Sequence, residues 1–317
     1  MKEKTAKDSH YARLRRRHRS NKAEQQSAEQ RQPQFRAKKP AAEQLWLYGF
    51  HTVEAALNNP RRVLHRLFLT RNAYDRLQQK QDAAGTSSLV AADDNRALSH
   101  HEKTPAAQPG ESRSNIYPAE KLCFSVPITI VEPKELDRIL GSQAVHQGIA
   151  LETEALRPQY NDDFGESSLI LLLDQITDPH NVGAIMRSAV AFNADFFITT
   201  MRHSPQETGV MAKSASGALE KITHLNVRNL AETLEKLHKA GFQTIGLDSA
   251  GDKLLESAFS GKKIAVVLGA EGKGLRQKTR QTVSVVARLD MPGAIKSLNV
   301  SNAAAIALYA ACRHKQA

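Results

Sequence analysis

Three polar, glycine-containing segments in the second half of the chain carry the side chains best suited to chemistry. They span residues 174–187, 268–275 and 289–301, and each follows an apolar run. Such continuous apolar runs are typical of strands that are buried on both faces of a parallel sheet. Because ligands bind just beyond the carboxyl ends of parallel strands, we expect these segments to form a ligand site.

The first segment places an amide and a guanidinium a short way apart. If a helix begins near Val182, Arg187 lies a little more than one turn inside it. Arg187 is then close enough to share a site with Asn181. Spacing alone leaves a second interpretation open, in which Asn181 caps the helix and Arg187 is a surface side chain.

The second and third segments differ in character. The second has three glycines within six residues, which lets the backbone approach a ligand closely. Asp290 lies about where a dinucleotide-binding fold keeps its ribose acid, but the glycines are spaced G-x-x-G-x-G and residues 276–282 are too polar for a packed helix, so nicotinamide binding is the weaker interpretation. The third segment is a loop with Ser297 and Asn299, and Ser301 is the expected N-cap of the final helix.

The elements that must position these segments form two α/β domains, residues 44–158 and 159–317. In the first domain, Thr52 is the expected N-cap of the first helix. The second domain should be an α/β sheet domain with buried parallel strands. Its expected strands are Leu169–Leu173, Phe196–Thr199, Thr244–Leu247, Ile264–Leu268 and Val283–Leu289, and its expected helices are Gly183–Phe192, Leu230–Ala240 and Ser301–Arg313.

Basic residues are concentrated at the start of the chain. Residues 1–43 hold 13 Lys and Arg against 5 Asp and Glu, which is +8 of the net charge of +11. Few large apolar residues accompany them, so we expect a disordered basic tail that attracts polyanions, nucleic acid above all. Residues 83–118 are rich in Ala, Ser, Asp, Pro and Gly and predict a mobile insertion in the first domain.

Several classes of protein are not expected from this composition. No run approaches the roughly 18 apolar residues of a membrane-spanning helix, so we expect no membrane association. No apolar stretch follows the first residues, which argues against a secretory signal. Cys123 and Cys312 lie in no metal-ligand spacing and cannot make a disulfide framework. We therefore expect reduced thiols, no metal site and a cytoplasmic protein.

The order and content of the three segments closely resemble one family, the SpoU branch of the SPOUT methyltransferases. Its motifs are N-x-G-x-x-x-R, L-G-A-E-G-x-G and M-x-G-x-x-x-S-L-N-V-S, at residues 181–187, 268–274 and 291–301. Upstream, residues 48–55 resemble the start of that family's ribosomal-protein-like RNA-binding domain, and residues 146–150 resemble its end. The resemblance thus extends over both predicted domains.

The resemblance implies an S-adenosylmethionine-dependent RNA 2′-O-ribose methyltransferase that works as a homodimer. Its second domain should hold a trefoil knot, an exception to the rule against threaded chains. The implied catalytic residues are Asn181, Arg187, Glu271, Ser297 and Asn299. The implied contacts of the cofactor are Gly269, Leu289, Met291 and Leu298, and Arg187 of one subunit is expected to reach the cofactor site of the other.

The third motif departs from the family pattern around the methionine. Relatives more often have a proline before it, whereas here Asp290 precedes Met291 and Pro292 follows it. Gly293 and the Ser297 register are kept. The departure concerns the backbone path around the adenine and not the reaction.

The implied substrate is a structured RNA. The leading interpretation is a guanosine of large-subunit ribosomal RNA, with transfer RNA as the alternative. A third possibility is a non-catalytic RNA-binding factor of ribosome assembly, against which the intact catalytic set argues. The first domain should choose the RNA, and its candidate phosphate contacts are Arg61, Arg62, Arg66 and Arg71.

Removal of residues 1–43 tests the role of the basic tail. The truncated protein should bind RNA more weakly and with a smaller salt dependence, because fewer counterions are released. The rate of the chemical step at saturating RNA should not change. Binding measured over a series of salt concentrations checks this expectation, and an unchanged salt slope would exclude the tail from RNA binding.

Overall fold

The computed structural model describes residues 44–89, 124–157, 159 and 163–316. The basic tail expected at residues 1–43 lies outside the described residues, as do residues 90–118 of the expected insertion. Residues 83–89 are the last part of helix α3 (Arg71–Leu89), which therefore extends past the expected start of the insertion.

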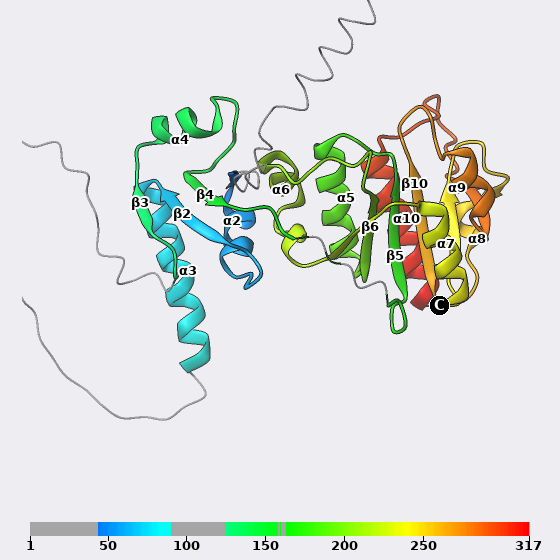
Figure 1. The fold of residues 1–317 in the computed structure, drawn as a ribbon, viewed down its shortest axis with the longest axis horizontal. Helices are drawn as coiled ribbons and strands as arrows, with labels where there is room; N and C mark the ends of the chain where they lie inside the picture. The colour runs from blue at the N-terminus through cyan, green and yellow to red at the C-terminus, as the bar shows by residue number, and fades with distance from the viewer. Residues whose placement is uncertain (1–43, 90–123, 158, 160–162, 317) are drawn as a thin grey trace, which may run out of the picture. The chain divides into compact units, whose positions relative to one another are not determined.

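A four-stranded sheet forms the small lobe, which we define as the described residues between 44 and 157 (Figure 1). Its strand order is β1-β4-β2-β3, with antiparallel neighbours except for the parallel pair β2 and β3. The strands are β1 (Leu45–Tyr48), β2 (Leu64–Leu69), β3 (Ile128–Ile130) and β4 (Ile149–Thr153). The helices of this lobe are α2 (Phe50–Leu57), α3 and α4 (Pro133–Leu140).

Helix α2 begins earlier than the sequence indicated. Gly49 occupies the N-cap with a φ of 85°, and no side chain caps the helix. The expectation that Thr52 is the N-cap was wrong: Thr52 is buried, and its hydroxyl donates to the carbonyl oxygen of Ala212 at 3.1 Å. A threonine inside the first turn thus serves a tertiary contact, because its hydroxyl meets an acceptor from another part of the chain.

A seven-stranded sheet in which every pair is parallel forms the large lobe, which we define as the described residues from 163 to 316. The strand order is β7-β6-β5-β10-β8-β11-β9. The strands are β5 (Leu169–Asp174), β6 (Phe196–Thr200), β7 (Thr223–Val227), β8 (Gln243–Leu247), β9 (Lys253–Leu254), β10 (Ile264–Gly269) and β11 (Val285–Arg288). The α/β class with a parallel sheet is as predicted.

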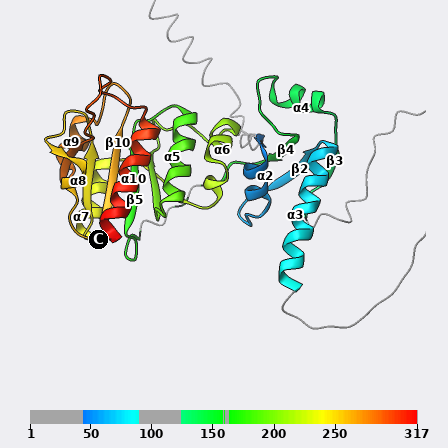
Figure 2. The ribbon, with the colours of Figure 1, turned by 180° about the vertical axis from the view of Figure 1, so that it is seen from behind.

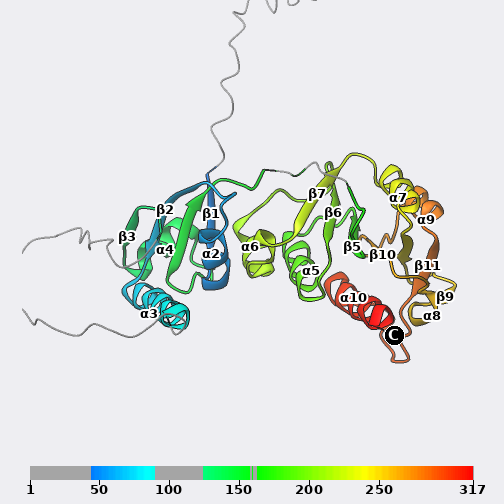
Figure 3. The same ribbon diagram turned by 90° about the horizontal axis from the view of Figure 1, so that it is seen from below.

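Helices cover both faces of the large sheet, which explains why its central strands are apolar throughout. Helices α5 (Pro179–Ala191) and α10 (Val300–Gln316) lie on one face, and α7 (Leu230–Lys239) and α9 (Gln277–Thr282) lie on the other (Figure 3). Alternate residues of each strand serve the two cores: Leu171 packs toward α5 and α10, and Leu172 packs toward α7. The short helix α8 (Leu255–Ala258) joins the first of these cores.

Several elements of the large lobe escaped the sequence reasoning, including β9, α8 and also α9, whose residues had looked too polar for a packed helix. Strand β7 reads Thr-His-Leu-Asn-Val and contains too many polar residues to look like a buried strand. Helix α6 (Gly209–Ala215) is shorter than two turns and has a small-residue, weakly periodic sequence. The 3₁₀ helix η2 (Ala218–Glu220) follows α6 directly.

Helix α6 lies between α2 of the small lobe and α5 of the large lobe in every view (Figure 2). Its packing on α5 depends on Gly183, where a Cβ atom would stand 2.3 Å from the carbonyl oxygen of Met211 and 2.7 Å from Cβ of Ser214. The glycine of the first motif therefore permits close helix packing.

Among the described residues, no helix is long and apolar enough to cross a membrane. The same part of the chain contains no cluster of His, Cys, Asp and Glu that would hold a metal ion. Cys312 is a free thiol on α10 whose Sγ donates to the carbonyl oxygen of Phe192 at 3.2 Å.

Candidate active site

The parallel pair β5 and β10 brings the first two motif segments to one edge of the sheet. Leu173 pairs with Leu268, and Asp174 pairs with Gly269, so both strands end at the same level. From β5 the chain proceeds to β6 and β7 on one side, whereas β8 and β11 lie on the other side of β10. The carboxyl edge between β5 and β10 is thus a topological switch point, where α/β sheets bind ligands.

An ion pair with a buried carboxylate ties the two loops together at this edge. The Asp174 carboxylate is fully buried, and it accepts from Nε of Arg276 at 2.6 Å and from the Arg276 backbone N–H at 3.1 Å. The adjacent Gln175 has a φ of 64°, a left-handed conformation that is uncommon for a residue with a side chain. The sequence reasoning treated residues 276–282 only as too polar for a packed helix, and it missed this pair.

Helix α5 starts earlier than Val182, and Asn181 is not its cap. Asp178 is the N-cap, and its carboxylate accepts from the backbone N–H groups of His180 and Asn181, each at 3.2 Å. Pro179 occupies the first helical position, as is common. The interpretation of Asn181 as a helix cap is therefore wrong, and its side chain is available for other contacts.

Three side chains, one from each motif segment, meet in a single hydrogen-bond network. Glu271 Oε1 accepts from Nδ2 of Asn181 at 3.3 Å and from Nδ2 of Asn299 at 3.0 Å. The Asn299 amide also donates to Oδ1 of Asn181 at 3.0 Å. The backbone N–H of Val300 completes the set by donating to the same Glu271 oxygen at 3.1 Å. One carboxylate oxygen thus joins the loop after β10 to the starts of α5 and α10.

Asn299 also caps the final helix, a role that we had expected of Ser301. Its Oδ1 accepts from the Ser301 backbone N–H at 2.8 Å, and its carbonyl oxygen accepts from the N–H groups of Asn302 and Ala303. The Ser301 hydroxyl donates to the same Oδ1 at 2.5 Å. The cap therefore lies two residues earlier than expected, and it holds the Asn299 side chain where it reaches Glu271.

The glycines of the second segment fold the loop back on itself. A Cβ atom at Gly269 would stand 2.2 Å from the carbonyl carbon of Gly274, and Gly272 and Gly274 have φ values of 75° and 65°. The Gly274 N–H donates to the carbonyl oxygen of Ala270 at 2.8 Å. These positions need glycine for the turn itself, a reason that the sequence reasoning, which considered only close approach to a ligand, did not include.

The remaining predicted residues stand apart from the network. The Arg187 side chain is exposed on α5, and no hydrogen bond or ion pair joins it to another described residue. Ser297 and Leu298 are exposed in the loop after β11, while Leu289 and Met291 are partly buried. Lys296 braces that loop by donating to the carbonyl oxygen of Met291 at 2.7 Å.

One of the four candidate phosphate contacts is not on the surface. The Arg62 side chain is fully buried and forms ion pairs with Glu207 and Glu220, so its expected role toward RNA is wrong. Arg66 is half-exposed beside Glu152, and its guanidinium holds the pKa of that carboxyl below its usual value. Sequence reasoning had no signal for the difference, because both arginines lie in one basic stretch.

The fold of the chain is that of a SpoU methyltransferase. The crystal structure of the SpoU methyltransferase AviRb from Streptomyces viridochromogenes, in complex with the cofactor AdoMet, matches with a TM-score of 0.60. The match covers 89% of this chain and 94% of that one, at 19% sequence identity.

The sequence comparisons agree. Residues 168–309 match the SpoU rRNA Methylase family, and residues 46–88 match the model for RNA 2′-O ribose methyltransferase substrate binding. The 23S rRNA (guanosine-2′-O-)-methyltransferase RlmB of Ralstonia nicotianae is 33% identical, over 85% of this chain and 95% of its own length. RlmB of Pseudomonas syringae pv. tomato is 32% identical, over 86% and 96%. The chain belongs to the SpoU rRNA methylase family.

Replacement of Asn299 tests the network. Asn299→Ala removes the cap of α10 and two bonds to the other segments, so the free energy of unfolding should fall by roughly 1–2 kcal/mol. Ser301→Ala is the matched control, since it removes only one hydroxyl next to the same cap, and it should change stability by about 0.5 kcal/mol or less. Urea titrations followed by circular dichroism measure both. Equal losses in the two variants would contradict the central place given to Asn299.

Proposed function

We propose that this protein transfers a methyl group from S-adenosylmethionine to the ribose 2′-hydroxyl of a guanosine in large-subunit ribosomal RNA. The observation that carries the proposal is its likeness, over nearly their whole length, to relatives named 23S rRNA (guanosine-2′-O-)-methyltransferase. Further support is that the family's three motif segments meet around Glu271, because a catalytic assignment requires their residues to share a site.

The loops at this edge have the chemistry that S-adenosylmethionine requires. Ile295 and Leu298 are 76% and 42% exposed, so apolar surface is uncovered in the loop after β11. Glu271 lies in the neighbouring loop and supplies a negative charge for a ligand that carries a positive sulfur. We assign the cofactor contacts to Gly269, Leu289, Met291 and Leu298. When bound, the cofactor supplies a methyl group on a sulfonium, which needs no further activation.

Arg187 is the residue proposed to act on the acceptor hydroxyl. An arginine has a pKa of about 12.5–13.8, so it is a poor proton acceptor at neutral pH. Its guanidinium is instead suited to stabilise the negative charge that develops on the 2′-oxygen and to orient the adjacent phosphate. Its lack of a protein partner supports this role, because its five N–H donors remain available to RNA.

The other proposed catalytic residues act by position. Asn181 lies on the same helix as Arg187, and its contacts with Glu271 and Asn299 hold the start of that helix against the cofactor loops. Ser297 is exposed in the loop beside them, where its hydroxyl is available to the substrate. Correct orientation of two bound reactants can contribute about 7–11 kcal/mol to a reaction of this type.

The two lobes divide the work in this proposal. Residues 44–158 select and hold the RNA, residues 159–317 bind the cofactor and carry out the transfer, and residues 1–43 add affinity that does not depend on sequence. The match of residues 46–88 to a substrate-binding model supports the first assignment. The proposed place of action is the cytoplasm, in keeping with ribosomal RNA as the substrate.

A reaction with defined RNAs tests the function. The protein, S-adenosylmethionine and unmethylated large-subunit ribosomal RNA should yield one ribose-methylated guanosine, located by mass spectrometry of nuclease fragments. Arg187→Lys should lower turnover at saturating RNA about 10- to 100-fold, because an ammonium cannot reproduce the planar fork. Near-normal turnover of this variant would contradict the role of Arg187. Methylation of transfer RNA alone would overturn the proposed substrate. Failure to bind S-adenosylmethionine in calorimetry would overturn the proposed enzymatic activity.

A trefoil knot in the segment that leads to α10 remains a prediction. We further propose a homodimer that uses the exposed face of α10. Ile306 and Tyr309 are 41% and 56% exposed on α10, so two large apolar side chains are uncovered on one helix. Tyr309 also packs edge-on against Phe192, the C-cap residue of α5. This face therefore continues toward the helix that carries Arg187, as a site shared between subunits requires.

Sedimentation measures the oligomeric state. The wild-type protein should sediment as a dimer at micromolar concentration, and Tyr309→Glu should shift it to the monomer, because a charge would be buried without a partner. Leu254→Glu is the matched control, since Leu254 is 38% exposed on the edge strand β9 and should leave the dimer intact. A wild-type protein that is monomeric at all concentrations would contradict the proposal.

A further inference from the structure

The most deeply buried ion cluster of the described chain is centred on Arg62 of the small lobe. Its side chain is fully buried, and those of Glu220 and Glu207 are 3% and 10% exposed. One terminal nitrogen donates to Oε1 of Glu207 at 2.6 Å and to the carbonyl oxygen of Glu154 at 2.9 Å. The other nitrogen donates to Glu220, and Nε contacts the second oxygen of Glu220 at 3.3 Å. The guanidinium therefore donates to Glu154 of the small lobe and to two glutamates of the large lobe.

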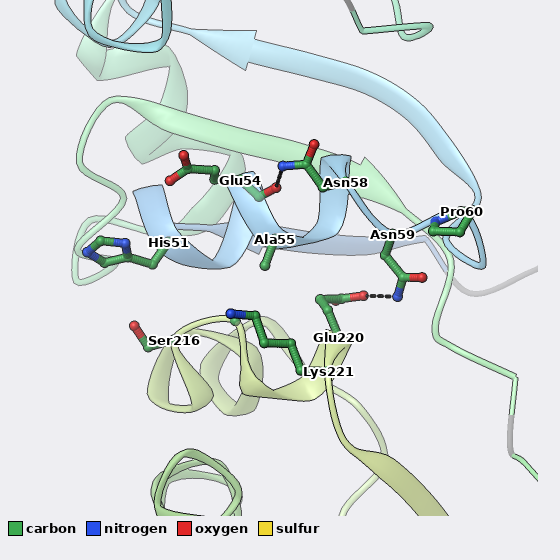
Figure 4. A pocket seen from close by; sticks show the side chains of 10 residues that line it. His51, Glu54, Ala55, Asn58, Asn59, Pro60, Ser216, Glu220 and Lys221 are labelled. Carbon is green, nitrogen blue, oxygen red and sulfur yellow. Dashed lines mark hydrogen bonds between the residues drawn. The ribbon is translucent and has the colours of Figure 1, made fainter. Parts of the chain in front are cut away.

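The two glutamates lie at opposite ends of one short segment. Glu207 immediately precedes Thr208, the N-cap of α6, and Glu220 is the last residue of η2. A single side chain of the small lobe thus holds both ends of residues 207–220. Asn59 strengthens the contact at Glu220, because its Nδ2 donates to the Glu220 carboxylate at 2.5 Å. Both residues border a cleft of about 480 Å³ between α2 and η2 (Figure 4).

The same segment packs on the helix that carries two proposed catalytic residues. Gly183 of α5 lies against the backbone of Met211 and Ala215, and the His180 ring and the Ser214 hydroxyl are hydrogen-bonded at 3.1 Å. On its other side, α6 accepts from Thr52 of the small lobe through the carbonyl oxygen of Ala212. Residues 207–220 are therefore the layer between the small lobe and the start of α5.

The ion cluster has a more specific geometry than is needed only to hold the two lobes together. Well-packed apolar side chains would hold two surfaces together at no greater cost, because buried charges lose their hydration. Here two carboxylates face one guanidinium, and burial raises the pKa of Glu207 despite the neighbouring charge. What such a cluster adds is direction, because the planar fork of an arginine donates to carboxylates in only a few orientations.

We propose that Arg62 is a positioning residue for methyl transfer, which holds residues 207–220 so that RNA bound to the small lobe meets Asn181 and Arg187 in one orientation. The inference rests on the proposed function for its catalytic consequence. Its physical core, the coupling of Arg62 to α5 through α6, does not depend on which RNA is methylated.

Hydrogen exchange measured by mass spectrometry on the full-length protein tests the coupling. Arg62→Gln should raise exchange about tenfold or more in residues 207–220, and also in residues 179–187, which Arg62 does not contact. Arg66→Gln is the matched control: it removes a charge from the same strand region, but Arg66 is 54% exposed and pairs only within the small lobe. Exchange that rises around Arg62 but stays unchanged in residues 179–187 would overturn the proposal.

A conservative variant keeps the test decisive if Arg62→Gln does not fold. Glu220→Gln retains the size and the acceptor oxygen of the side chain and removes its charge. It should give the same pattern of increased exchange at a smaller amplitude, and its circular dichroism should match that of the wild-type protein. A folded Glu220→Gln protein with wild-type exchange in both segments would overturn the proposal.

Kinetic measurements test the proposed role of Arg62 in methyl transfer. With large-subunit ribosomal RNA, Arg62→Gln and Glu220→Gln should lower the single-turnover rate at saturating RNA about tenfold or more, with S-adenosylmethionine affinity unchanged in calorimetry. Arg138→Gln should leave this rate unchanged, because Arg138 is 77% exposed on α4 and pairs with Glu135 of the same helix. An unchanged rate in a variant with increased exchange would overturn the positioning role. A wild-type protein that methylates no RNA would contradict the proposed function, and the exchange result would still decide the coupling.

Discussion

The parallel pairing of β5 with β10 is the constraint on which the rest of the site depends. These strands are far apart in the sequence, yet their register ends both at one level, Asp174 beside Gly269. The loops that follow must then share one edge, and the ion pair of the buried Asp174 with Arg276 closes them on each other. Everything that Glu271 touches follows from this arrangement, because its loop starts where β10 ends.

Close backbone packing carries this arrangement outward to the small lobe. Gly183 lets α6 lie directly on α5, and Gly217 lies against α2, where a Cβ atom would stand 2.9 Å from that of Ala55. The segment of α6 and η2 is thus held on both sides with little room for a side chain between backbones. The ion cluster of Arg62 adds orientation to this packing, because apolar contacts are not directional whereas hydrogen-bonded ion pairs are.

The chemistry proposed for the site needs a fixed frame more than an unusual ionisation. The network around Glu271 holds the ends of three elements in place through side chains that touch one another, and Arg187 stays outside it with its donors free of protein partners. This division suits a methyl transfer in which the methyl group is already activated. Placement of the acceptor oxygen and compensation of its charge are then the work left to the protein.

The sequence by itself determined the parallel α/β class, the central strands and the identity of the residues that meet, because apolar runs and motif order are local properties. Asn181, Glu271 and Asn299 were all named from it. Only the tertiary structure decided the roles that depend on neighbours distant in the chain. Thr52 and Ser301 looked like helix caps. Thr52 instead donates a hydrogen bond to α6, and Asn299 caps α10 in place of Ser301. Arg62 looked like a phosphate contact, yet two glutamates beyond residue 200 bury it, and no local pattern encodes partners so far away.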